Sequence, residues 1–293
     1  METTDEGIGK SVYNQILSEV HQAPKARQEL ICGIEEELNM TVISFFVSCY
    51  PGAMIHDSDA NMLQDLLLNT KINDNGLVLI LNSNGGDGLA AERIVNICRA
   101  YSKNKFYVIV PGKAKSAATI ICLGCSKIYM SPTAELGPID PQVFAEDSGV
   151  MSVHSIVYSY DRLFKEARFA EGRLEPYLQQ LEKYSNSQIE ELRRALELSE
   201  SIAIKLLKSG MMKELAEDTI KKKIELFLSP LNTKSHGRPI FLSDAVQCGI
   251  NIEEMKIDSK LWKLVWSLFS RADYVLSSGT LKLMESRDAN YRV

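Results

Sequence analysis

Short apolar runs alternate with helix-patterned stretches along the first half of the chain. Residues 41–48, 76–81 and 106–110 are mainly apolar and often β-branched, which is typical of strands buried on both faces. Residues 59–68 and 90–101 instead carry apolar side chains at helical spacing. Strands that alternate with helices predict crossover connections and a mostly parallel sheet.

Further elements extend this pattern in both directions. An amphipathic segment spans residues 10–38, a short apolar helix is expected at 116–123, and a short strand at 126–130. From about residue 155 the chain becomes rich in charged, helix-forming residues. One long amphipathic helix is predicted there by apolar or small residues at i, i+3 and i+4 spacing. These residues are Ile189, Leu192, Leu196, Ser199, Ala203 and Leu206.

Nothing in the sequence divides the chain into separate units. Its 293 residues allow one large domain or two modest ones, and we find no internal repeat or low-complexity linker. We therefore expect a single domain over residues 1–293, with an α/β core at about 25–155 and a helix-rich elaboration at about 156–293. Trp262 and Trp266 lie on a late helical stretch, and we interpret them as core or subunit-contact residues.

Composition and charge narrow the function classes. The hydrophobic fraction is 45% and the charged fraction 24%, which are ordinary values for a soluble globular protein. The formal net charge of −5 leaves no basic field to hold a nucleic-acid backbone. The six cysteines are scattered, mostly in apolar segments, which suits free thiols in a reducing compartment.

The chain shows no targeting or membrane signal. No apolar run approaches the roughly 20 residues that a membrane span needs. The first residues are acidic and lack the apolar stretch of a signal peptide. These features lead us to expect a soluble, cytoplasmic protein without a membrane span.

The first segment that suggests chemistry is the glycine-rich turn after the apolar run at 76–81. It reads Asn82-Ser83-Asn84-Gly85-Gly86 and precedes a helical stretch. Glycines allow close approach of a ligand, and their N–H groups can face an anion. The phosphate-binding motifs GxGxxG and GxxxxGK[ST] are absent, which favours an oxyanion hole over a phosphate cradle. A plain strand-to-helix turn is the alternative.

Two later segments carry a serine and an aspartate. Ser116 stands where the third apolar run gives way to a helix, so it is either an N-cap or a nucleophile held beside a helix N-terminus. Asp140 is bracketed by Pro138 and Pro141, which hold it in a rigid, non-helical stretch. A structural turn that uses the Asp140 side chain is the alternative.

Together these three segments resemble the Clp protease proteolytic subunit and its relatives in the ClpP/crotonase superfamily. The N-S-x-G-G turn of that family matches residues 82–86, and its G-x-A-x-S nucleophile turn matches 112–116. Where that family has a His before Gln-Pro, this chain has Asp140-Pro141-Gln142. Residues 114–119 and 135–141 are similar to a narrower branch, the serine dehydrogenase proteinase family, over roughly residues 25–255.

The resemblance to this branch implies a catalytic triad in the order Ser, Asp, His, so a histidine after Asp140 is required. Of the four histidines, His21 and His56 precede Ser116. His236 lies in a polar loop with Gly and Pro, before a small helix at 243–248, and resembles the family's histidine loop. His154 is the alternative base.

Two other features of the sequence have both a chemical and an ordinary structural interpretation. A Ser–Lys dyad would need a buried, neutral lysine, and Lys165 is the candidate, although a solvated helix charge is the simpler interpretation. Cys122 and Cys125 form a C-x-x-C pair, which suggests a redox motif or half a zinc site. No second pair with zinc spacing appears, so we interpret them as buried packing thiols.

The resemblance implies an α/β protein with a ClpP/crotonase-like fold, repeated ββα units and a helical C-terminal extension. It implies a serine endopeptidase that acts on peptides or proteins without a metal or organic cofactor. Ser116 would attack the carbonyl, and Asp140 would orient the His236 base. The N–H groups of Gly86 and Ala117 would form the oxyanion hole, and Gly85 would contact substrate.

Three alternatives to this triad peptidase remain open. They are a Ser–Lys peptidase, an acyl-CoA hydratase or isomerase of the same superfamily, and a non-catalytic peptide-binding scaffold. Proteins of this superfamily commonly form rings or trimers. The long amphipathic helices offer more apolar surface than one core needs, so we expect a homo-oligomer.

Overall fold

A central β-sheet organises the protein. A computed structural model describes residues 24–145, 149–229 and 237–293, together with residues 12 and 16. Within these ranges the main sheet has seven strands in the order β10-β5-β3-β2-β1-β11-β12. Their bounds are β1 Thr41–Val47, β2 Leu77–Asn82, β3 Phe106–Val110, β5 Lys127–Met130, β10 Ile252–Glu254, β11 Lys282–Glu285 and β12 Asn290–Arg292. The strands from β10 to β1 run parallel, whereas β11 and β12 are antiparallel to their neighbours.

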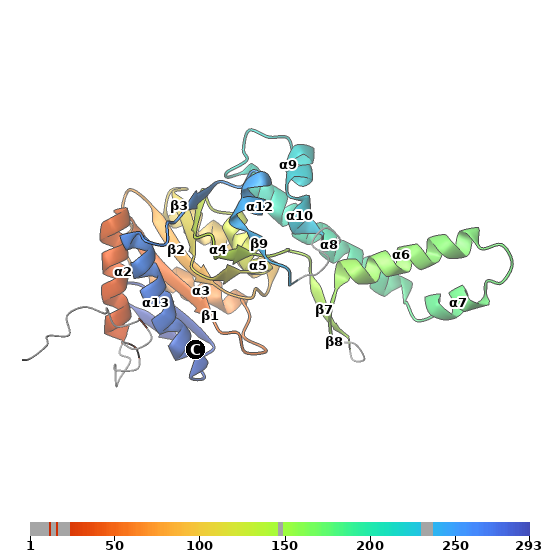
Figure 1. Ribbon diagram of the computed structural model, residues 1–293, viewed down its shortest axis with the longest axis horizontal. Coiled ribbons are helices and arrows are strands. Elements are labelled where there is room, and N and C mark those ends of the chain that lie inside the picture. Colours follow the sequence, from red (N-terminus) through yellow and green to blue (C-terminus); the bar gives the residue numbers. More distant parts are fainter. Residues whose placement is uncertain (1–11, 13–15, 17–23, 146–148, 230–236) are drawn as a thin grey trace, which may run out of the picture.

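Helices cover both faces of this sheet. On one face α2 (Pro24–Leu38) and α13 (Lys260–Ser277) lie side by side (Figure 1). Val42 and Phe46 of β1 pack towards them, whereas Ile43 and Phe45 pack into the core on the other face. This division follows from the strand geometry, because successive side chains point to opposite faces.

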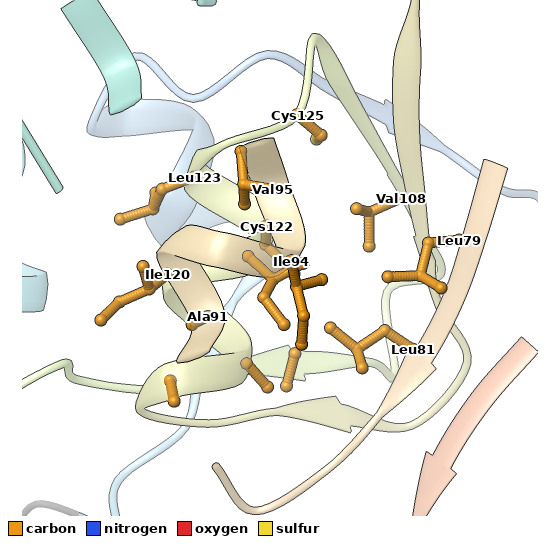
Figure 2. Close-up of a cluster of buried hydrophobic side chains, with 14 of the residues drawn as sticks. Leu79, Leu81, Ala91, Ile94, Val95, Val108, Ile120, Cys122, Leu123 and Cys125 are labelled. Carbon is orange, nitrogen blue, oxygen red and sulfur yellow. The ribbon is translucent and has the colours of Figure 1, made fainter. Parts of the chain in front are cut away.

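The other face is covered by three helices of the first half and by α8 (Asn186–Lys208). These helices are α3 (Asp57–Leu68), α4 (Gly88–Tyr101) and α5 (Ala117–Leu123). Figure 2 shows Ile94 and Cys122 facing Leu81 and Val108 of the sheet.

Cys122 and Cys125 are fully buried, which confirms them as packing thiols. Burial raises the pKa of the Cys125 thiol to about 12 and raises that of Cys122 well above its usual value.

Smaller sheets and an arm extend from this core. Strands β4 (Lys113–Ala114), β6 (Glu135–Leu136) and β9 (Ile240–Phe241) form a three-stranded sheet, and β7 (Gln142–Ala145) pairs with β8 (Gly149–Ser152). Beyond this hairpin, α6, α7 and part of α8 project away from the sheet (Figure 1). The remaining helices are α6 Val153–Phe169, α7 Glu175–Leu181, α9 Glu217–Lys223, α10 Glu225–Leu228 and α12 Leu242–Gln247. No helix in the described ranges is both long and apolar enough to cross a bilayer.

The strands and helices predicted up to residue 130 are present, with bounds that differ by at most two residues for those in the described ranges. The sequence predicts that the α/β core ends near residue 155, but in the structure later residues also belong to the core. Strands β10, β11 and β12 lie at the two edges of the main sheet, and α13 covers one of its faces. The region at 156–293 therefore supplies part of the core as well as the helical arm.

Buried ion pairs attach the late strand β11 to the first part of the chain. Lys282 Nζ lies 2.8 Å from both carboxylate oxygens of Asp59, and Arg27 makes two hydrogen bonds, of 2.8 and 2.9 Å, to Glu285. All four side chains are at least nine-tenths buried. Each charge is compensated at short range, which makes its burial tolerable.

Candidate active site

Ser116 occupies a strained backbone conformation at the start of α5. Its φ of 49° and ψ of −119° lie in a region that L-residues with a side chain rarely adopt. Ser116 occupies the N-cap position of α5, but its hydroxyl makes no capping hydrogen bond to the helix, so the side chain does not act as a cap. Ser116 is half-buried, and no described residue forms a hydrogen bond with its Oγ. The Ser116 hydroxyl therefore makes no hydrogen bond that would stabilise the described part of the fold.

The glycine-rich turn after β2 packs directly against this serine. Ser83 pairs with Ala114 on the turn that carries Ser116, and Gly85 N–H donates to Ser83 Oγ at 3.0 Å. Gly85 has φ +113°, and a Cβ there would lie 2.7 Å from both Ser116 Cβ and the Lys115 carbonyl oxygen. Only glycine permits both the conformation and the close approach. The structure thus brings Gly85 and Ser116 together.

Gly86 and Ala117 each have a backbone N–H beside this contact that donates to no described residue. Ile55 pairs with the turn through Ile55 N to Gly85 O and Asp87 N to Ile55 O, both at 2.9 Å, which leaves the N–H of Gly86 outside the pairing. Ala117 is the first residue of α5, so its N–H has no acceptor within the helix. No described residue accepts a hydrogen bond from either group.

The segment that carries Asp140 is bonded to the turn that carries Ser116. Strands β4 and β6 pair in parallel. Thr119 Oγ1 lies 2.7 Å from Ala114 O and 2.9 Å from Gly137 O, and it accepts a hydrogen bond from Gly137 N. Asp140 is 1% exposed, and one of its oxygens accepts a hydrogen bond from Ser152 Oγ at 2.6 Å.

Asp140 and His154 line one open pocket of about 560 Å³, whose walls come mainly from α8, α9 and α10. The Nε2 atom of His154 lies 3.2 Å from Ser229 Oγ. Its Nδ1 atom is buried and has no hydrogen-bond partner among the described residues. Ser116 is not among the described residues that line this pocket.

The remaining histidines and Lys165 are the other residues considered as a general base. His236 and His21 lie outside the described residues. His56 is exposed at the start of α3. Lys165 is exposed on α6, so the burial that would make it a neutral base is missing and the solvated interpretation is confirmed.

Sequence reasoning assigned no role to three residues around the site. Lys115 forms an ion pair of 2.9 Å with Glu135, and Ser152 holds the buried Asp140. Lys115 directly precedes Ser116, and Glu135 begins the segment that ends at Asp140, so their positions in the motifs were visible. The pairing itself depends on the parallel contact between β4 and β6, which no local pattern reveals.

The fold and this site define a mixed α/β protein compatible with a ClpP-like fold, with a serine turn set against a glycine turn. The chain belongs to the ClpP-like SDH-type serine proteinase family, whose model matches residues 14–270. This match confirms the family inferred from the three sequence segments.

Two curated relatives come from Methanocaldococcus jannaschii, and both are named as uncharacterized proteins. The chain is 33% identical to MJ0137 over 132 residues, which is 42% of this chain and 45% of the relative. It is 27% identical to MJ1495 over 190 residues, which is 64% of this chain and 55% of the relative. The chain therefore spans about half the length of these relatives.

Proposed function

We propose that the protein is a serine endopeptidase with Ser116 as its nucleophile. The observation that carries this proposal is the backbone of Ser116. A non-glycine residue held at φ 49° and ψ −119° costs on the order of 1–3 kcal/mol and persists only where its surroundings impose it. The Ser116 hydroxyl does not cap the helix, so a capping role does not explain the strained backbone. A nucleophile that the backbone must orient towards a substrate does explain it.

In the proposed reaction Ser116 Oγ attacks the carbonyl carbon of a peptide bond, and a general base takes the hydroxyl proton. The carbonyl oxygen becomes an oxyanion and accepts hydrogen bonds from the N–H groups of Gly86 and Ala117. The C–N bond then breaks as the leaving amine takes the proton. Water hydrolyses the acyl-enzyme, and Gly85 supplies backbone contact to the substrate.

His236 is our proposed base, with Asp140 as its orienting carboxylate. His236 lies outside the described residues, so its assignment rests on the family's triad. The chain on both sides supports it, because Ser229 lines the same pocket as Asp140 and Ile240 of β9 pairs with Leu136 of β6. We expect the reaction rate to rise with pH through one ionisation near ~6 to 7, where a histidine loses its proton.

The remaining features of the proposal concern context. We propose that the fold is related to the crotonases through repeated ββα units, and that the protein is cytoplasmic and acts on peptides or proteins. We also propose a homo-oligomer. Exposed aromatic residues on α6, namely Tyr158, Phe164 and Phe169, are candidates for the subunit contact because they leave apolar surface in water.

A fluorophosphonate probe tests the nucleophile directly. In this reaction Ser116 Oγ bonds to phosphorus, fluoride leaves, and the base takes the proton. We expect one adduct on Ser116 in the wild type and none in Ser116→Ala. The control Ser201→Ala, which changes an exposed serine on α8, should label normally. Equal labelling of Ser116→Ala would contradict the proposal, and a hydratase or a scaffold would leave Ser116 unlabelled.

A further inference from the structure

The Lys115 side chain connects the nucleophile turn to the segment that carries Asp140. Its Nζ lies 2.9 Å from Glu135 Oε1 and donates a hydrogen bond of 3.0 Å to the carbonyl oxygen of Leu136. Only 12% of the Lys115 side chain is exposed, so water screens this pair less than an ordinary surface ion pair. The amine thereby joins residue 115 to the strand β6.

The aliphatic part of Lys115 packs across Gly137. A Cβ at position 137 would lie 2.4 Å from Lys115 Cδ and 3.4 Å from Lys115 Cα and Cβ. Any side chain at this position would push the lysine away. Lys115 therefore contacts Glu135, Leu136 and Gly137 in sequence, through both its charge and its hydrocarbon stem.

A change at Gly137 would be transmitted to Asp140, because Pro138 and Ile139, the two residues between them, have little freedom. Pro138 and Pro141 fix their own φ angles on either side of Asp140. Ile139 N–H donates to Phe227 O at 2.8 Å. The same lysine is bonded covalently to Ser116, whose strained backbone needs support from its surroundings.

We propose that Lys115 is a positioning residue whose contacts with Glu135 and Gly137 hold Ser116 and Asp140 at their working separation. This inference rests on the proposed peptidase function, in which both residues belong to one reaction. Lys115 need not touch the substrate in this role. It acts through the two backbone segments that it joins.

Four variants separate this role from a general loss of an ion pair. Lys115→Met keeps an apolar stem and removes the ammonium, Glu135→Gln removes the partner charge, and Lys115→Arg keeps the positive charge. Lys127→Met is the control, because Lys127 forms a comparable 2.8 Å ion pair with Glu253 between the parallel strands β5 and β10.

Two rates are measured: amide hydrogen exchange at Gly137 and Ile139, and fluorophosphonate acylation of Ser116. In Lys115→Met and in Glu135→Gln we expect amide exchange at Gly137 and Ile139 to be about tenfold or more faster, because the ion pair no longer fixes the segment that contains these amides. Acylation should slow by about 10–100-fold, the order of loss that a displacement near 1 Å causes. The double variant Lys115→Met/Glu135→Gln should be acylated little more slowly than Lys115→Met, because each single change already removes the same contact. Lys127→Met should change neither rate.

A pH profile distinguishes positioning from a merely structural role. If Asp140 is displaced, it stabilises the protonated base less, so the midpoint of the acylation profile moves to lower pH in Lys115→Met. Lys115→Arg should restore the wild-type midpoint and most of the rate. Wild-type acylation and an unchanged midpoint in Lys115→Met would overturn the inference. A wild type that does not react at Ser116 would instead overturn the peptidase proposal, while the exchange rates would still decide whether Lys115 holds residues 135–140.

Discussion

Replacing Ser116 with glycine should raise the stability of the fold while it removes the nucleophile. Ser116→Ala keeps a Cβ and therefore keeps the strain of the φ 49°, ψ −119° backbone. Because Ser116 Oγ makes no hydrogen bond with described residues, the alanine variant should have nearly wild-type stability. Ser116→Gly has no Cβ, so the same backbone conformation costs it little.

The size of the difference follows from two opposing contributions. Relief of the strained conformation contributes about 1–3 kcal/mol to the free energy of unfolding. The greater freedom of glycine in the unfolded chain removes about 0.4–1 kcal/mol. Ser116→Gly should thus be more stable than Ser116→Ala by about 1.3 kcal/mol at the middle of both ranges and by at most about 2.6 kcal/mol. For a chain of this length that corresponds to a melting temperature about 1–4 °C higher.

Thermal melting monitored by circular dichroism measures this difference, and fluorophosphonate labelling shows that both variants are inactive. Ala100→Gly is the matched control, because Ala100 is exposed within the ordinary helix α4 and should lose about 0.5–1 kcal/mol there. The strain argument is refuted if Ser116→Gly melts below Ser116→Ala by an amount similar to the loss in this control.

Two further predictions concern buried groups. Arg27→Met should lower the free energy of unfolding by about 3–5 kcal/mol in urea titrations, because Glu285 would remain buried without the positive charge that compensates it. Arg27→Met/Glu285→Leu should recover most of this loss, and a single variant within 1 kcal/mol of wild type would contradict the expectation. Because burial raises the pKa of Cys125 to about 12, little thiolate forms at pH 8, so a thiol reagent should modify exposed Cys49 first and Cys125 only after unfolding. Peptide mass spectrometry checks this order, and equal rates in the folded protein would refute it.

The central strands could be predicted because their physical signal is local. Strands β1, β2 and β3 are flanked on both faces by helices, so nearly every position is apolar and the runs are visible without knowledge of the fold. Strand β11 has no such signal, since it begins with Lys282 and ends with Glu285, and both are buried. Their compensating charges come from Asp59 and Arg27, more than 200 residues away. Long-range pairing of this kind cannot be inferred from the pattern of one segment.

The candidate site divides in the same way. Gly85 and Ser116 could be singled out because each stands in a turn motif whose residue types limit the backbone, although the φ of Ser116 itself could not be foreseen. The surroundings of Asp140 depend instead on contacts between distant segments, such as the hydrogen bond from Ser152. Lys115 shows both cases. Its place in the motif can be read from the local sequence, whereas its contact with Glu135 depends on a distant segment. Lys115 is adjacent to the proposed nucleophile, but its contacts come from a second segment. A substitution at such a residue would change the geometry of the site without changing any proposed reacting group.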